Sequence, residues 1–168
     1  SSNGQLVSPS LSLTISPSTT TFSNLSAGNS YTDSQNTTLT TSTNAYNGYV
    51  IRAYLTDYLR STTGGFTISD FTGGTYASPA TWNGSETGFG YTSSDTSIAG
   101  VNKFSSGTLY APFSQTSPGD IVADHATGVT GTSVNAEQFT LTYKVKVPST
   151  QAAHNYSTGI VYTATAQY

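Results

Sequence analysis

The densest cluster of side chains that could bind a metal ion lies between positions 120 and 137. Asp120, Asp124 and His125 are close together, and Glu137 follows a short distance along the chain. Calcium is held by several oxygen ligands, often supplied by one loop. The spacing of an EF-hand is absent, and acidic groups in loops more often face water or cap turns. Asp120, Asp124 and Glu137 are nevertheless the residues in this chain that could bind calcium, and no other cofactor is expected.

Catalytic motifs of familiar kinds are missing from the sequence. Acyl transfer by a side-chain nucleophile needs a base and an orienting group, and only His125 and His154 could act as imidazole bases. Neither a G-x-S-x-G elbow nor an HExxH helix is present. The other acidic residues are scattered, so no pair suited to glycoside hydrolysis is visible. We expect a protein that is not an enzyme.

Four aromatic residues lie among short, glycine-punctuated segments and could stack against sugar rings. They are Tyr76, Trp82, Phe89 and Tyr91. The alternative, which we favour, is that they pack in the core and at its rim.

Four N-x-S/T sequons provide candidates for glycosylation: Asn24, Asn36, Asn83 and Asn155. Ser and Thr make up 57 of the 168 residues, so such triplets arise readily by chance. Glycosylation is an option that depends on the host.

Cations are few, and they form no basic stripe. The net charge is −3 with five Lys and Arg residues, so nucleic acid is not an expected partner. An intramolecular isopeptide bond from Lys144 or Lys146 to an asparagine would need a desolvated lysine. Both lysines alternate away from an apolar face, and we interpret them as exposed strand charges that discourage edge pairing.

The composition favours strands over helices. Only 8% of residues are charged, whereas Thr and Tyr are abundant, which is typical of an all-β chain. A length of 168 residues suits one domain. No segment approaches the roughly 20 apolar residues of a membrane-spanning helix. The first residue is not Met, which is consistent with signal-peptide removal and equally with a sequence that starts late.

The C-terminal part shows the clearest strand pattern. Between positions 139 and 147 apolar and polar residues alternate, and Pro148 ends the run. A second alternation covers 160–166, so we expect two long antiparallel strands. Tyr156, followed by Gly159, resembles the tyrosine corner of immunoglobulin-like sandwiches, in which the hydroxyl bonds to nearby backbone. The alternative is an aromatic residue at a strand entry.

Weaker signals organise the remainder of the chain. Asn47-Gly48 predicts a two-residue hairpin between strands at 37–46 and 49–54, and helical spacing predicts a short turn near 55–60. A strand is expected near 66–71, an edge strand near 109–113, and a long connection over 115–135. Seven or eight strands result, and we predict an immunoglobulin-like or jelly-roll antiparallel β-sandwich.

Two stretches carry a family resemblance: TLTYKVKVPSTQAAHNYSTGIVYTATAQY and TTSTNAYNGYVI. Together they resemble camelysin/TasA-type fibre proteins and, more weakly, WxL-type cell-surface domains. The resemblance covers part of the chain and implies a secreted Ser/Thr-rich sandwich of a microbial surface. Its motifs are structural, so the peptidase activity ascribed to camelysin-like proteins is not carried over. Trp82 is the single tryptophan and precedes Asn83-Gly84, so wall binding is not carried over either.

The N-terminal segment has a strand pattern of its own, with apolar residues alternating from Val7 to Ile15. It could be the first strand of its own sandwich or a strand donated to a neighbouring subunit. A third alternative combines the two: residues 1–10 extend outward to a neighbour, and residues 11–168 form a single domain. The residues expected at the subunit interface are Leu6, Val7, Pro9, Leu11, Leu13, Ile15, Ala164 and Ala166.

These patterns predict a secreted structural subunit of an extracellular filament or surface layer. It would polymerise with copies of itself by donating its N-terminal strand. The alternative from another class is a carbohydrate-binding or adhesin module that contacts surface glycans.

Overall fold

The computed structural model describes residues 7–23, 25, 33–125 and 131–168. Within these residues there are strands and turns but no helix, and every pair of named strands is antiparallel. The prediction of an all-β fold is confirmed. The described part of the chain also has no helix with the length and apolar character needed to cross a membrane.

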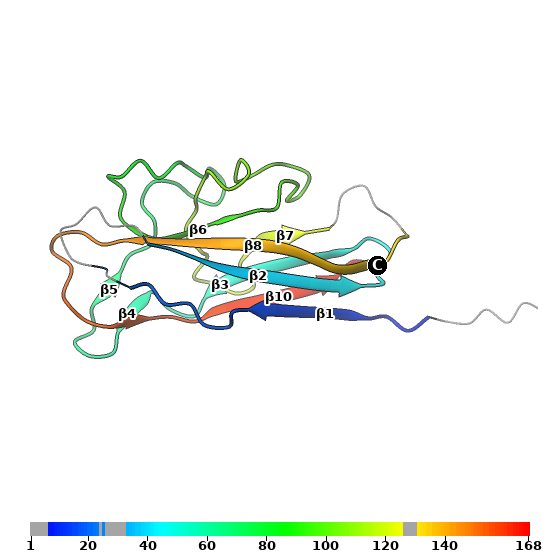
Figure 1. Ribbon diagram of the computed structural model, residues 1–168, viewed down its shortest axis with the longest axis horizontal. Coiled ribbons are helices and arrows are strands. Elements are labelled where there is room, and N and C mark those ends of the chain that lie inside the picture. Colours follow the sequence, from blue (N-terminus) through cyan, green and yellow to red (C-terminus); the bar gives the residue numbers. More distant parts are fainter. Residues whose placement is uncertain (1–6, 24, 26–32, 126–130) are drawn as a thin grey trace, which may run out of the picture.

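The described residues form three sheets, two of them large. The first has the order β1 (Leu11–Ser16), β2 (Asp33–Thr43), β8 (Val134–Lys146), β6 (Gly88–Ser93). The second has the order β10 (Ile160–Ala166), β3 (Tyr49–Leu55), β7 (Asp120–Asp124). The third is small: β5 (Thr67–Ile68), β4 (Leu59–Ser61), β9 (Tyr156–Ser157). The two large sheets stack along their strands, with β4 and β5 at one end and residues 7–10 at the other (Figure 1).

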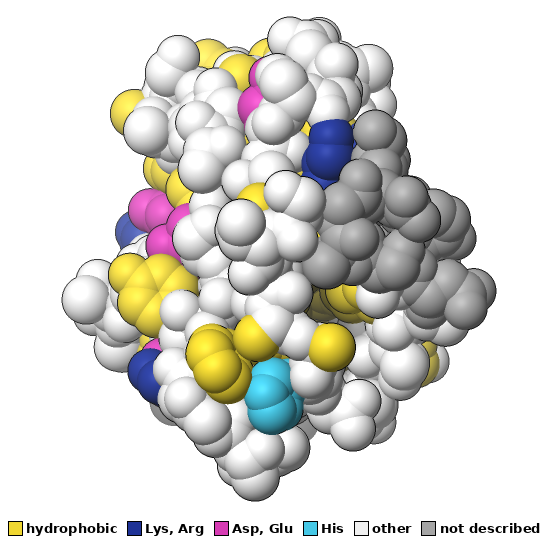
Figure 2. All heavy atoms as spheres, turned by 90° about the vertical axis from the view of Figure 1, so that its left-hand side faces the viewer, with side chains coloured by type: hydrophobic (Ala, Val, Ile, Leu, Met, Phe, Trp, Pro, Cys, Tyr) yellow, Lys and Arg dark blue, Asp and Glu magenta, His cyan; other side chains and the backbone are white. Residues whose placement is uncertain are grey.

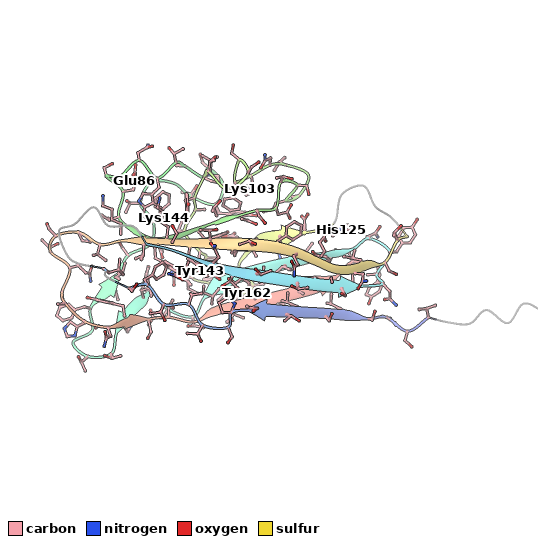
Figure 3. All side chains as sticks on the ribbon, in the orientation of Figure 1. Glu86, Lys103, His125, Tyr143, Lys144 and Tyr162 are labelled. Atoms are coloured by element: carbon pink, nitrogen blue, oxygen red, sulfur yellow. The ribbon has the colours of Figure 1, made fainter. Side chains whose placement is uncertain are left out.

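Alternating side chains from the two large sheets form the core. Leu39 and Leu141 point inward from the first sheet, and Ile51 and Leu55 point inward from the second, all almost fully buried. Tyr143 of β8 and Tyr162 of β10 meet between the sheets through their hydroxyl groups (Figure 3). Burial is the main cause that raises the pKa of both hydroxyls, so both stay neutral as the core requires.

The turn at Asn47-Gly48 occurs, but the predicted hairpin is wrong. β2 pairs with β1 and β8, whereas β3 pairs with β10 and β7, so the turn carries the chain from one sheet to the other. Gly48 has φ 76°, and a Cβ there would collide with the His125 carbonyl oxygen. Asn47 donates its backbone N–H to Gln167 instead of to a hairpin partner.

Three further boundaries differ from the sequence-based predictions. The helical turn near 55–60 is wrong, because β3 ends at Leu55 and β4 begins at Leu59. The connection over 115–135 is wrong as well, since it contains β7. Within 109–113, Tyr110 and Ala111 form isolated bridges, and the range contains no named strand. The described residues contain ten strands, more than the seven or eight expected.

The interpretation of the two β8 lysines as exposed edge charges is wrong. β8 is a central strand, paired with β2 on one side and β6 on the other. The chain between β5 and β7 covers part of the outer face of β6 and β8 (Figure 1). Lys146 is only 9% exposed and donates to the Gly84 carbonyl. Burial lowers the pKa of Lys144.

Tyr156 makes the hydrogen bond that the tyrosine-corner interpretation predicts. Its hydroxyl donates to the Ala152 carbonyl oxygen at 2.7 Å and accepts from the Gln151 amide at 2.7 Å. Gln151 also donates to the Thr67 carbonyl oxygen at 3.1 Å. This network anchors the β8–β10 connection to β5.

Candidate functional site

One long edge of the sandwich, formed by β6 and β7, is closed by backbone hydrogen bonds. Ala111 exchanges two of them with Tyr91 of β6, at 2.9 and 3.0 Å, and Leu55 of β3 donates to Ser114 at 2.8 Å. Ser93 of β6 donates its hydroxyl to the Val122 carbonyl of β7 at 2.7 Å. Residues 110–114 therefore act as a strap that ties the two large sheets together.

The opposite long edge, formed by β1 and β10, lacks such a strap among the described residues. The Gly159 carbonyl accepts from the Thr56 N–H, and the Gln167 N–H donates to the Gly48 carbonyl, just beyond the two ends of β3. Along an antiparallel ladder, residues whose backbone groups face the partner strand alternate with residues whose groups face away. The backbone N–H and C=O groups of Tyr162, Ala164 and Ala166 therefore point away from β3. β10 is an edge strand with no partner on that side in the described part of the chain. We call the β1–β10 edge, with these outward-facing backbone groups of β10, the open edge.

Two predicted interface residues lie on the open edge. Ala164 and Ala166 are half-buried and sit opposite Ile51 and Tyr49 of β3.

The N-terminal strand stays within its own sandwich from Leu11 onward. β1 pairs with β2 over its whole length, with Leu11 opposite Thr43. Leu13 and Ile15 pack against the core, while Leu11 is 38% exposed. This pairing agrees with the mixed alternative, in which only residues 1–10 could extend to a neighbour.

Residues 7–10 belong to no strand. Val7 is 79% exposed, and Pro9 is exposed as well. Asn44 holds the segment near β1 by donating to the Ser8 carbonyl and accepting from the Ser10 N–H, both at 2.8 Å. Leu6 lies outside the described residues.

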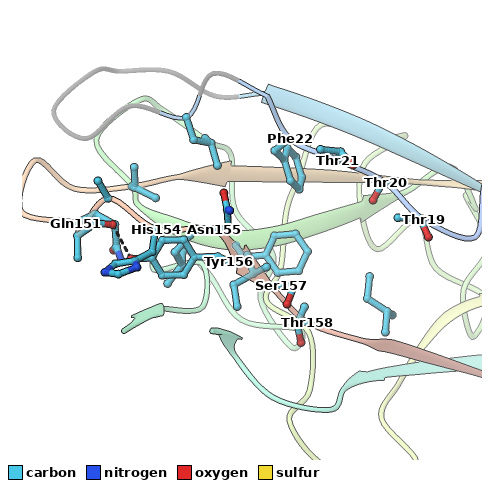
Figure 4. Close-up of a pocket in the computed structure, with 18 residues that line it drawn as sticks. Thr19, Thr20, Thr21, Phe22, Gln151, His154, Asn155, Tyr156, Ser157 and Thr158 are labelled. Atoms are coloured by element: carbon cyan, nitrogen blue, oxygen red, sulfur yellow. Dashed lines mark hydrogen bonds between the residues drawn. The ribbon is translucent and has the colours of Figure 1, made fainter. Parts of the chain in front are cut away.

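A pocket opens at the end of the sandwich opposite residues 7–10. Its volume is about 820 Å³, and it lies between residues 19–22 with Leu25 on one side and residues 151–158 on the other (Figure 4). The apolar side chains in its lining are Phe22, Leu25, Leu59, Ile68, Phe89, Val147, Tyr156 and Ile160. Among the described residues of its lining there is no Asp, Glu, Lys or Arg, and the pocket reaches Ile160, where β10 begins.

Aromatic and apolar groups are exposed around this end of the molecule. Figure 2 looks onto the end where β4 and β5 lie and shows apolar side chains beside a histidine. His154 stacks on Phe66, with ring centroids 5.0 Å apart, and Phe66 is 43% exposed. No pattern in the sequence predicted this pocket. Phe22 and Leu25, the two large apolar residues after a run of threonines, were its one local signal.

The three calcium candidates do not form a site. Asp124 accepts from the Ala99 N–H at 2.7 Å, whereas Glu137 accepts from Tyr49 at 2.7 Å and contacts His125 at 2.9 Å. Asp120 is elsewhere on β7, and burial raises its pKa. Among the described residues, no three acidic, His or Cys side chains are grouped so that they could hold a metal.

Asp95 is a buried partner that sequence reasoning did not connect with Asp124. Its carboxylate accepts the Asp124 N–H at 2.8 Å and the Ser97 N–H at 2.8 Å. These bonds tie the loop after β6 to β7, so the acidic cluster is structural. No local pattern links two residues so far apart in the chain.

The four aromatic residues proposed as a sugar platform do not share a surface. Phe89 is 4% exposed and Tyr91 is 0% exposed, both in the core. Tyr76 donates its hydroxyl to the Ile121 carbonyl at 2.8 Å. Trp82 is half-buried and stacks on Phe71 at 4.4 Å.

The Lys144 side chain lies against the rings of Trp82 and Tyr110, beneath the covering loops that carry Glu86 and Lys103 (Figure 3). Its ammonium is 5.4 Å from the Trp82 ring centroid and 5.2 Å from that of Tyr110. A cation held over aromatic faces is attracted by their electron density, so Lys144 helps to fasten the loops to β8.

Three of the sequon asparagines are exposed: Asn36 on β2, Asn83 in a turn and Asn155 before β9. Asn24 lies outside the described residues. Each of the three is accessible to a modifying enzyme.

No family model, curated protein or solved structure matches the chain. The open edge, the exposed N-terminal residues and the end pocket are therefore interpreted from their own geometry.

Proposed function

We propose that the chain is a structural subunit of a secreted extracellular filament, as its resemblance to camelysin/TasA-type fibre proteins implies. Residues 1–10 of one copy add as a strand to the open edge of the next copy. The observation that carries this proposal is the row of unpaired backbone groups on β10 that leads into the apolar end pocket.

Strand addition uses the backbone groups that the open edge leaves free. An added strand gains main-chain hydrogen bonds, while alternate side chains fill pockets. Ten residues in extended conformation span about 33 Å at roughly 3.3 Å per residue. β10 has seven residues, so with Leu6 and Val7 at the pocket, residues 1–5 can pair along the first part of β10.

The donated segment and the pocket are also matched in polarity. Residues 1–10 read SSNGQLVSPS and contain no charged side chain. Of the lining residues that the structure describes, His154 is the one with an ionisable acidic or basic group apart from Tyr156. Docking Leu6 and Val7 there would bury apolar surface without desolvating an ion, which is costly when unpaired.

The position of the two elements favours a linear polymer. Residues 7–10 leave the sandwich at one end, and the pocket lies with β4 and β5 at the other (Figure 1). A head-to-tail contact between different surfaces does not close on itself unless its rotation forms a ring. Repetition of this contact would therefore build a filament.

Deleting residues 1–10 tests the donor half of the proposal. We expect the truncated chain to fold, because β1 and its pairing with β2 remain, but not to form filaments in negative-stain microscopy. A synthetic peptide with residues 1–10 should cap growing wild-type ends. Deletion of residues 1–4, which leaves Leu6 and Val7 in place, is the matched control. Normal filaments from the longer deletion would refute strand donation.

Ala164→Pro tests the acceptor half. The Ala164 N–H points away from β3, and proline is tolerated on an edge strand whose N–H faces outward. The variant should keep its fold and still donate its own N-terminus, but it should accept no incoming strand. Thr163→Pro is the contrasting variant: its N–H faces β3, so the fold itself should be weakened. Undiminished polymerisation of folded Ala164→Pro would exclude the open edge of β10 as the acceptor.

A further inference from the structure

We propose that the outer face of the first large sheet is a self-association surface through which neighbouring filaments bundle side by side. We call it the hydroxyl face and define it by Thr14 of β1, Thr38 and Thr40 of β2, and Gln138, Thr140 and Thr142 of β8. The occupant is the same face of a copy in an adjacent filament. The inference rests on the proposed function for the existence of filaments, but the chemistry of the face can be tested without them.

The strand register arranges these side chains in rows. Thr40 lies opposite Thr14 on one side and Gln138 on the other. Thr38 likewise lies opposite Thr140, and the intervening Leu39 points into the core with 0% exposure. Rows repeat about every 6.8 Å along the strands, and strands lie about 4.8 Å apart. The result is a regular array of short polar groups.

The array is uncharged, which distinguishes it from the neighbouring surfaces. Lys144 continues the outward positions of β8, but it is half-buried beneath Trp82 and Tyr110. The outer face of the second sheet carries Arg52, which donates to the Gly119 carbonyl at 3.0 Å. The hydroxyl face can therefore meet a copy of itself without like-charge repulsion.

The chemistry of the face makes it self-complementary. Each Ser or Thr hydroxyl can donate one hydrogen bond and accept others, so the same groups on a second copy provide partners in either strand direction. Gln138 already donates to the Thr40 hydroxyl at 3.3 Å, which shows that side chains of one row on neighbouring strands are within hydrogen-bonding reach.

The size of the face indicates that single contacts are weak. Three strands of about six residues cover roughly 300 Å² at these spacings, whereas a stable pair buries about 800 Å² per partner. Isolated subunits should therefore remain separate. In filaments the same contact repeats along the length, and multivalent contacts strengthen binding without any new interaction. The proposed face would therefore give bundles of filaments without dimers of free subunits.

Paired lysine substitutions test the face. Thr40→Lys/Thr142→Lys places two positive charges in different rows, and Thr108→Lys/Thr116→Lys adds the same charge at exposed loop positions between β6 and β7, outside both the face and the pocket lining. Unglycosylated protein is used, since Asn36 lies opposite Thr142 and a sugar there would cover the face. We expect wild-type and control filaments to bundle, and at least tenfold fewer bundles from the face variant. Equal bundling of the two variants would overturn the inference.

A second measurement separates this inference from the proposed function. Streptavidin beads densely coated with biotinylated monomer should cluster with the wild-type and control proteins but not with Thr40→Lys/Thr142→Lys. If the wild type forms no filaments, the proposed function fails while the beads still report on the face. Beads that never cluster, or that cluster equally with every variant, refute the hydroxyl face. Circular dichroism checks the fold, and single Thr142→Lys replaces the pair if the pair unfolds.

Discussion

The two long edges of the sandwich differ in whether their outward-facing backbone groups are bonded to other segments. At the β6–β7 edge, residues 110–114 bond to both sheets, and Phe113 stacks on Tyr91 with ring centroids 4.1 Å apart. At the β1–β10 edge, backbone groups of Ala164 and Ala166 point outward, and Leu11 is 38% exposed. A bare edge is an aggregation hazard that most proteins cover, and the proposed strand addition would cover this one.

The two edges also differ in the side chains that they carry. Aromatic side chains concentrate at the closed edge, where Phe89, Phe113 and Tyr143 lie within about 6 Å of one another. Small and hydroxyl side chains dominate the open edge. We therefore expect substitutions at the closed edge to unfold the monomer and substitutions at the open edge to affect mainly how copies meet.

The largest effect is expected for Phe113→Ala at the closed edge. Phe113 is 3% exposed, and truncation of a buried Phe to Ala lowers the free energy of unfolding by about 3–5 kcal/mol. Leu11→Ala at the open edge is the comparison and should lower it by less than about 1 kcal/mol, given its exposure. Urea unfolding monitored by circular dichroism measures both. Equal losses would mean that the two edges contribute alike.

A smaller loss of stability is expected for Trp82→Ala, in the loops that cover the outer face of β6 and β8. Loss of a half-buried ring that stacks on Phe71 should lower the free energy of unfolding by about 2 kcal/mol. Retention on polysaccharide columns should not change, because the other aromatic residues proposed as a sugar platform are buried or bonded internally. Tight glycan binding that disappears in a folded variant would instead favour an adhesin.

Alkaline pH should weaken the closed edge through Tyr76, whose hydroxyl bonds to the Ile121 carbonyl of β7. Burial raises the Tyr76 pKa to about 12, whereas an unfolded tyrosine ionises near pH 10. The stabilisation is therefore fully present below pH 10 and is lost as the pH rises toward 12. In Tyr76→Phe, the melting temperature should fall less steeply over this range. Tyr58→Phe, at an exposed position, is the control and should follow the wild type.

The smallest effect is expected for Asn44→Ala at the open edge. The substitution removes two hydrogen bonds that hold Ser8 and Ser10 beside β1. A local loss of about 1 kcal/mol would speed amide exchange in β1 roughly fivefold by easing its fraying. Amides of β8, in the middle of the sheet, should be unaffected in hydrogen-exchange mass spectrometry. Faster exchange in both strands would show that β1 does not open separately.

Several features could be predicted because they depend on local patterns. Alternation of side chains identified most of β8 and β10, since a strand with one buried face must alternate. Pro148 follows β8 closely because proline cannot donate to the ladder. Tyr156 makes its backbone bond only four residues away, to Ala152. Each of these outcomes involves residues close in the chain.

Other features depend on which segments become neighbours in space. Asn47-Gly48 encodes a turn, but the pairing of β2 with β8 and of β3 with β10 decides that it joins two sheets. Lys144 alternates outward as expected, yet a distant loop covers it. The bond from Asp124 to Asp95 likewise has no local signature.

The sequence by itself determined the strand class, the buried face of each long strand and the strand-ending proline, because these follow from the side chains and backbone of adjacent residues. Only the tertiary structure decided which edge is closed, where the end pocket lies and which polar face stays bare. Alternation states that one face of a strand must be buried, but it does not state which distant segment buries it. That choice is made by packing between sheets, where contacts join residues far apart in the chain.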